Sequence, residues 1–138
     1  MMQKYFENEY ALYMLKDQIV HITYKKGVEI DLKASKQIVR DRLEFQEERP
    51  YPVLCDIRHL RRVDKPARDF LAVQGSLLVT ALAIIIEPPV TDAMTQFYLR
   101  TNNPDIPTDS FSETAKAIGY LEKFLGVVLW LALFKLNL

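Results

Sequence analysis

Hydrophobic and polar positions follow several different patterns along the chain, and the first of them predicts strands. Two short runs rich in aromatic and aliphatic residues, 10–15 and 19–24, flank a polar break at 16–18. Paired runs of this kind indicate a β-hairpin. Gly27 marks a turn after the hairpin, and residues 28–30 are expected to extend the same sheet.

The pattern then changes to a helical period. One face is formed by Leu32, Ser35, Ile38, Val39, Leu43 and Gln46. Asp31 is a suitable N-cap before this face, and Pro50 and Pro52 cannot continue a helix beyond it. We therefore expect an amphipathic helix over residues 32–47.

Two apolar strands and a second helix are predicted next. Residues 53–57 and 79–86 are short apolar runs, and the second is expected to be a central strand covered on both faces. Between them, Asp64 is expected to cap a helix that has Pro66 in its first turn and is closed by Gly75.

The last third of the chain repeats the alternation of helix and strand. A third helix is expected from Pro89 to the break at 102–104. Residues 106–111 are predicted to form a short edge strand, because Pro107 has no N–H to donate to a neighbouring strand.

A fourth helix and an apolar tail complete the predicted elements. Ser112 is expected to cap the helix, which should end near Leu125 because Gly126 is a natural residue to follow a helix. The tail, residues 126–138, carries the apolar side chains of Val127, Val128, Leu129, Trp130, Leu131, Leu133 and Phe134. We expect a second copy of the chain to cover them, which makes a homo-oligomer. Membrane contact through the tail is the less favoured alternative.

Strands that alternate with helices predict an α/β fold. The expected sheet is mixed but mainly parallel, with a leading β-hairpin and about four helices. The length fits a single domain over residues 1–125, followed by the tail.

Composition narrows the classes of function. Lys plus Arg and Asp plus Glu are both 18, so the net charge is +0 and does not suggest nucleic-acid binding. The one cysteine, Cys55, cannot form an internal disulfide, and the polar N-terminus does not resemble a secretory signal. We therefore expect a cytoplasmic protein.

Candidate catalytic chemistry is sparse. His21 and His59 have no second histidine or cysteine at metal-ligand spacing, and Cys55 sits in mid-strand like a small buried hydrophobe. No phosphate-binding loop or hydrolase motif occurs in the sequence. We expect no catalytic residues, no metal site and no cofactor.

The stretch from 56 to 69 is the richest in charge. It joins a predicted central strand to a helix start, where α/β proteins often place functional groups. The candidate binding residues are Asp56, Arg58, His59, Arg61, Arg62, Asp64 and Lys65. They are expected to form an exposed positive rim for a phosphate or an acidic partner surface; the alternative is a solvated loop neutralised by its own aspartates.

At this loop the sequence resembles the STAS domain, the fold of bacterial anti-sigma-factor antagonists. Residues 53–56 look like the apolar strand ending in Asp with which that family's signature begins. Residues 64–67 occupy its second motif, which reads Asp-Ser-Ser/Thr-Gly in the family. The order of elements is similar from about residue 10 to residue 125. The resemblance implies a STAS-like fold and a regulatory role in protein interaction.

One residue departs from the family in a way that affects function. Regulatory members are phosphorylated at a serine or threonine after the second Asp, and here that position is Lys65. We therefore expect no phosphorylation switch in this loop.

Two hypotheses follow from these observations. The first is a non-catalytic STAS-like regulatory module of a bacterium that binds a protein partner and lacks the phosphorylatable serine. The alternative is a carrier or binder of a lipid or other apolar small molecule, since apolar segments and a basic loop suit such a ligand.

Overall fold

A computed structural model describes residues 4–89 and 106–136, with residues 126–136 described by their backbone alone. Six strands form the main sheet: β1 (Lys4–Glu7), β2 (Ala11–Lys16), β3 (Ile19–Tyr24), β5 (Tyr51–Asp56), β7 (Val79–Ile85) and β8 (Thr108–Phe111). Their spatial order is β1-β2-β3-β5-β7-β8. The first three strands are antiparallel, and β3, β5, β7 and β8 are parallel. The predicted mixed, mainly parallel sheet with a leading hairpin is confirmed.

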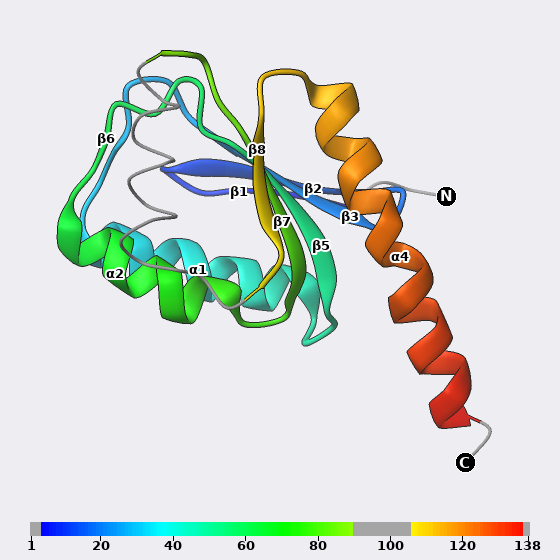
Figure 1. The fold of residues 1–138 in the computed structure, drawn as a ribbon. Helices are drawn as coiled ribbons and strands as arrows, with labels where there is room; N and C mark the ends of the chain where they lie inside the picture. The colour runs from blue at the N-terminus through cyan, green and yellow to red at the C-terminus, as the bar shows by residue number, and fades with distance from the viewer. Residues whose placement is uncertain (1–3, 90–105, 137–138) are drawn as a thin grey trace.

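Helices cover both faces of the sheet (Figure 1). The described part of the chain contains α1 (Leu32–Gln46), α2 (Lys65–Val73) and α4 (Thr114–Leu136), with a short 3₁₀ turn at Gln74–Ser76 after α2. Helices α1 and α2 contact each other on one face, and α4 packs on the other. The helix predicted to start at Pro89 lies outside the described residues.

Successive side chains of β7 point to opposite faces of the sheet, so this strand contributes to the hydrophobic core on each face. Ala81, Ala83 and Ile85 face α4, and all three are buried. Leu82 and Ile84 face the α1 and α2 side. Small alanines on the α4 side allow the helix to approach the sheet closely, through Ala117 and Leu121, which are both 0% exposed.

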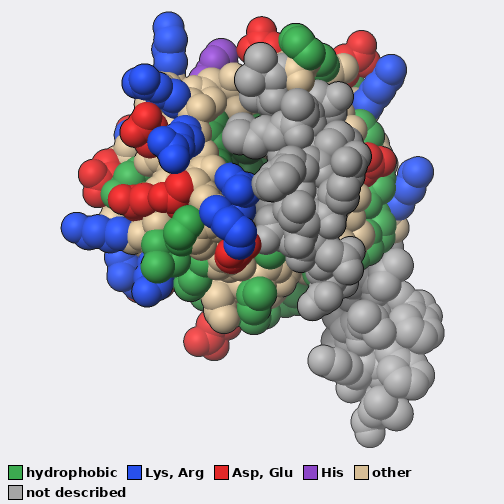
Figure 2. Space-filling model, turned by 60° about the vertical axis from the view of Figure 1, so that its left-hand side comes forward, with side chains coloured by type: hydrophobic (Ala, Val, Ile, Leu, Met, Phe, Trp, Pro, Cys, Tyr) green, Lys and Arg blue, Asp and Glu red, His purple; other side chains and the backbone are tan. Residues whose placement is uncertain are grey.

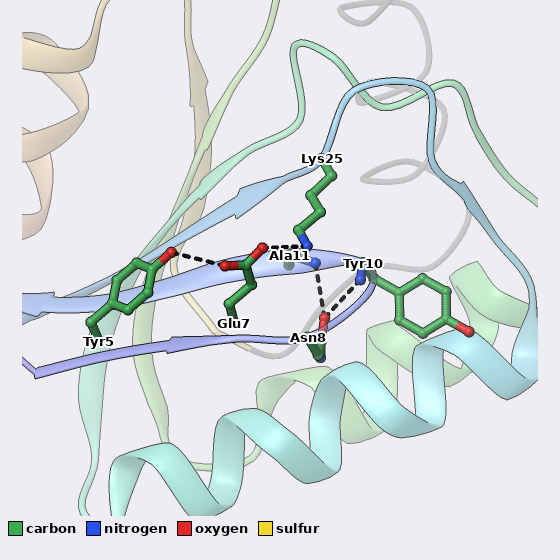
Figure 3. Close-up of polar contacts among 6 residues, drawn as sticks. All are labelled: Tyr5, Glu7, Asn8, Tyr10, Ala11 and Lys25. Carbon is green, nitrogen blue, oxygen red and sulfur yellow. Dashed lines mark hydrogen bonds and ion pairs between the residues drawn. The ribbon is translucent and has the colours of Figure 1, made fainter.

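A first strand, β1, was not expected from the sequence. Asn8 forms the turn after it, because its side-chain oxygen accepts hydrogen bonds from the Tyr10 and Ala11 backbone nitrogens at 2.8 and 2.9 Å (Figure 3). The Asn8 side-chain nitrogen donates to Asp41 on α1 at 2.8 Å. The strand has only four residues, too few to show a clear period.

An ion pair ties β1 to the segment after β3. The Lys25 ammonium lies 2.6 Å from the Glu7 carboxylate, which also accepts a hydrogen bond from the Tyr5 hydroxyl at 3.3 Å (Figure 3). The hydrogen bond and charge of Lys25 lower the pKa of Glu7. The pair therefore links β1 to the end of β3, although these two strands are not neighbours in the sheet.

The sequence placed residues 28–30 in the main sheet, and this was wrong. Glu29–Ile30 forms β4, which pairs in parallel with β6 (Arg62–Val63) as a separate two-stranded sheet. The pairing partner comes from the charged loop after β5, and a local pattern cannot reveal a contact over this sequence separation.

One predicted helix end was wrong. Helix α4 continues through Gly126 to Leu136, because the apolar run that follows this glycine contains no proline or polar stop. A glycine inside a helix costs only about 1 kcal/mol and does not by itself end it. Helix α2 does end next to Gly75 as predicted: Gln74 is its C-cap, and Gly75 follows within the 3₁₀ turn.

Candidate functional site

The charged loop after β5 begins with a close pairing of Asp56 and Arg58. The Arg58 guanidinium donates to both carboxylate oxygens of Asp56, at 3.0 and 2.7 Å. Burial of Asp56 acts to raise its pKa, but the hydrogen bonds and charge of Arg58, with the charge of His59, lower it overall. Arg58 is therefore occupied in holding the end of β5 rather than free to meet a ligand.

Backbone hydrogen bonds fix the rest of the loop. The Gly27 nitrogen donates to the His59 carbonyl at 2.9 Å, and the Arg61 nitrogen donates to the Val28 carbonyl at 3.0 Å. The pairing of β4 with β6 continues this contact. The loop is thus attached to the segment that leads into α1, and its side chains are presented from a fixed backbone.

The exposed cations of the loop lie among acidic side chains. Arg61 is 3.5 Å from Glu29, and Lys65 is 2.7 Å from Asp69. Arg62 is exposed on β6. Figure 2 shows blue and red side chains interspersed on this side of the molecule. The exposed positive charge of the predicted rim is carried by Arg61, Arg62 and Lys65, whereas Arg58 is half-buried.

The helix start after the loop has the geometry that the sequence predicts. Asp64 caps α2, and its side chain accepts a hydrogen bond from the Ala67 backbone nitrogen at 3.0 Å. Lys65 is the first residue of the helix and is exposed. No serine, threonine or tyrosine occurs from 56 to 69. A phosphate ester therefore cannot form on a side-chain hydroxyl anywhere in this stretch.

Neither Cys55 nor the histidines resemble catalytic groups. Burial, together with the charge of Asp56, raises the pKa of the Cys55 thiol to about 12, so it carries almost no reactive thiolate. Burial and the charge of Lys16 lower the pKa of His21, and His59 is exposed in the loop. Within residues 4–89 and 106–125, no three metal-binding side chains are grouped as a metal site.

A cavity that the sequence did not suggest lies beneath the loop. Its volume is about 130 Å³, and it opens between α1, α2 and the strands β3, β5 and β7. Its apolar walls are Ile22, Ile38, Val39, Val53, Ile57, Leu60, Val63, Leu71, Val79, Leu82 and Ile84. Tyr24, Arg42, Cys55 and Arg68 also line it.

Arg42 is the unexpected member of this wall. It is 3% exposed, whereas Leu32, expected on the buried face of α1, is 38% exposed. The sequence does contain one signal for the burial of Arg42. It follows Val39 by three residues and Ile38 by four, which places it on the buried face of α1. Its guanidinium donates to Gln46 at 2.6 Å and to the Gly75 carbonyl at 3.2 Å.

The predicted tail is not a separate segment. Residues 126–136 continue α4, and Figure 1 shows this half of the helix extending past the end of the sheet. Side chains of the seven predicted contact residues, between Val127 and Phe134, lie outside the described part. None of the helices in the part of the chain that the structure describes is long and apolar enough to cross a membrane.

The strand order and the helices on both faces of the sheet define a SpoIIAA-like fold. A crystal structure of an uncharacterised DUF3478-family protein from Shewanella loihica PV-4, which has this fold, is similar with a TM-score of 0.55. The two sequences are 13% identical, and the match covers 87% of this chain and 92% of that chain. The resemblance seen at residues 53–56 and 64–67 is thereby confirmed at the level of fold.

The chain belongs to a family described as a domain of unknown function, DUF7793, whose model matches residues 13–125. No curated protein matches the sequence. The matched span begins within β2 and ends within α4, so it contains the charged loop and the described wall of the cavity.

Proposed function

We propose that this chain is a non-catalytic regulatory module that acts by binding another protein through the loop at residues 56–65. The observation that carries the proposal is the presentation of Arg61, Arg62 and Lys65 as exposed cations on a fixed backbone, beside the start of α2. An acidic surface of a partner protein would suit this arrangement.

Regulation by phosphorylation is not part of the proposal. The STAS members that the sequence resembles are switched at a serine or threonine, and Lys65 holds a permanent positive charge in that place. We therefore propose that partner binding is controlled by the abundance of the two proteins or by another site, and not by phosphorylation of this loop.

The experiment that tests the proposal is quantitative capture of partners from native cells. The tagged chain is compared with the double variant R61E/R62E, and with K33E/K36E as a control that reverses two exposed lysines on α1. We expect R61E/R62E to lower recovery of a reproducible partner by about tenfold or more, because like charges at an interface cost several kcal/mol. Equal recovery by both double variants, or no reproducible partner, would contradict the proposal.

A second copy of this chain is the partner that we propose for α4. Residues 126–134 contain no polar side chain, and the backbone shows them in a helix that extends past the sheet (Figure 1). A helix that is apolar on all sides requires a cover. The net charge of +0 does not oppose self-association.

The size of the cavity bears on the alternative function, a carrier or binder of a lipid or other apolar small molecule. At about 130 Å³ it is smaller than the roughly 300–1,000 Å³ of pockets that take drug-sized ligands. We therefore do not propose a carrier of whole lipids, and the cavity is better considered as a site for a small molecule.

A further inference from the structure

The cavity wall combines an apolar surface with one buried cation. We propose that this cavity binds a small monocarboxylate with an apolar body of about six carbons, whose carboxylate pairs with Arg42. This inference does not depend on partner binding at the charged loop, because that binding is proposed for Arg61, Arg62 and Lys65, and none of these residues lines the cavity.

Arg42 lacks an anionic partner in the part of the chain that the structure describes. Its two hydrogen bonds go to neutral acceptors, the Gln46 amide oxygen and the Gly75 carbonyl. A guanidinium has five N–H donors, and a buried charge is normally paired. Burial lowers the pKa of Arg42, and no carboxylate of the described residues is among the groups that oppose this effect.

The position of Arg42 is fixed, so the charge is presented from a rigid support. Gln46 donates in turn to the carbonyls of Arg49 and Leu78 at 2.8 and 2.9 Å. This network connects the end of α1 to the residues that follow it and to the segment between α2 and β7. A bound carboxylate would therefore meet a guanidinium whose rotamer is already set, which reduces the entropy lost on binding.

The walls set the character of the rest of the ligand. Eleven lining residues are aliphatic, from α1, α2, the loop and three strands. An apolar cavity of about 150 Å³ holds one benzene ring, so about 130 Å³ suits a body of about six carbons. Tyr24 adds a hydroxyl to the wall, and burial keeps it protonated by raising its pKa well above the usual value.

The test compares three probes of equal length: hexanoate, hexan-1-ol and hexylamine. Each is titrated into the full chain and followed by the backbone amide signals in NMR. We expect hexanoate to bind at one site and to shift signals around Val39, Cys55 and Leu71, which line the cavity. Hexan-1-ol should bind about ten- to a hundredfold more weakly, because it lacks the charged hydrogen bond, and hexylamine should bind least.

Two variants locate the effect. Arg42→Met keeps much of the side-chain length and removes the charge, so hexanoate should bind no better than hexan-1-ol. Arg40→Met removes an exposed charge from the same helix and should leave the preference for hexanoate unchanged.

Three results would overturn the proposal. They are an absence of hexanoate binding to the folded chain, equal binding of hexanoate and hexan-1-ol, and a preference for hexanoate that survives in Arg42→Met. The comparison of the three probes on the unmodified chain decides the matter even if Arg42→Met does not fold.

Discussion

Asp56 and Arg58 show at the scale of single residues how a charged loop can be both basic and largely structural. Arg58 donates hydrogen bonds to both carboxylate oxygens of Asp56, and this pairing lowers the pKa of Asp56 by more than burial raises it. The sequence alone marked both residues as candidates for binding a ligand. Their pairing assigns them to the support of the loop, and it leaves recognition to the exposed cations that follow.

The first prediction concerns the pKa of Asp56. In the variant Arg58→Gln the pKa of this carboxyl should rise, because the charge and hydrogen bonds of the guanidinium are lost while the effect of burial remains. A carbon-13 NMR titration of the side-chain carboxyl measures it, and Arg61→Gln, which alters the pair with Glu29, serves as the control. An unchanged pKa in Arg58→Gln would show that the pairing does not form in solution.

The same pair has a consequence for stability at low pH. The folded state binds the proton of Asp56 more weakly than the unfolded chain does, because its pKa is lowered. This contribution to stability is therefore present above the ordinary pKa of an aspartate, and it is lost as the pH falls through the lowered value. In Arg58→Gln this part of the acid sensitivity should disappear.

At the scale of elements, α4 covers one face of the sheet, and its fully buried side chains in the described part are Ala117 and Leu121. Leu121 is 0% exposed and packs in a cluster with Ile19, Leu54 and the small alanines of β7. This contact fixes the first half of the helix, and the second half continues from it past the sheet.

The second prediction tests that contact. Leu121→Ala should lower the free energy of unfolding by about 2–5 kcal/mol, the usual cost of an empty space left by a buried leucine. Lys123→Ala, at an exposed position on the same helix, should change it by less than about 0.5 kcal/mol. Urea unfolding of both variants gives the comparison, and equal losses would mean that α4 does not pack on the sheet as described.

Most elements could be predicted because their signals are local. The caps at Asp31 and Asp64, the β2–β3 hairpin and the apolar run of β7 all depend on residues close in sequence. The pairing of β4 with β6 and the burial of Arg42 depend on contacts between distant segments, and no local pattern contains them. The end of α4 cannot be predicted from Gly126, because the apolar run after this glycine continues the helix.

The sequence predicted where the candidate site lies, but not which of its residues support the loop and which are exposed. The charged stretch does lie between β5 and α2, with Asp64 at the helix cap. Arg58 differs from the exposed cations because it folds back onto Asp56, and the sequence alone does not contain this geometry. The cavity could not be predicted at all, since it is formed by α1, α2 and three strands together.

At the scale of the whole molecule, the second half of α4 governs the expected oligomeric state. The third prediction is that the full chain is a dimer in light scattering, and that deletion of residues 127–138 makes it a monomer. The physical reason is the uninterrupted apolar run, which a single copy would leave in contact with water if nothing covers it. A monodisperse monomer of the full chain, without lipid or detergent, would refute this prediction.

Native mass spectrometry of the chain, purified gently from its own cells, is the most direct test of whether it binds another protein. We expect complexes that contain a second, different protein at a fixed ratio. Raising the salt concentration before the measurement should dissociate them, because exposed charges carry the contact. Spectra that show this chain alone or only with further copies of itself, whether or not a small molecule is bound, would contradict a function in binding another protein.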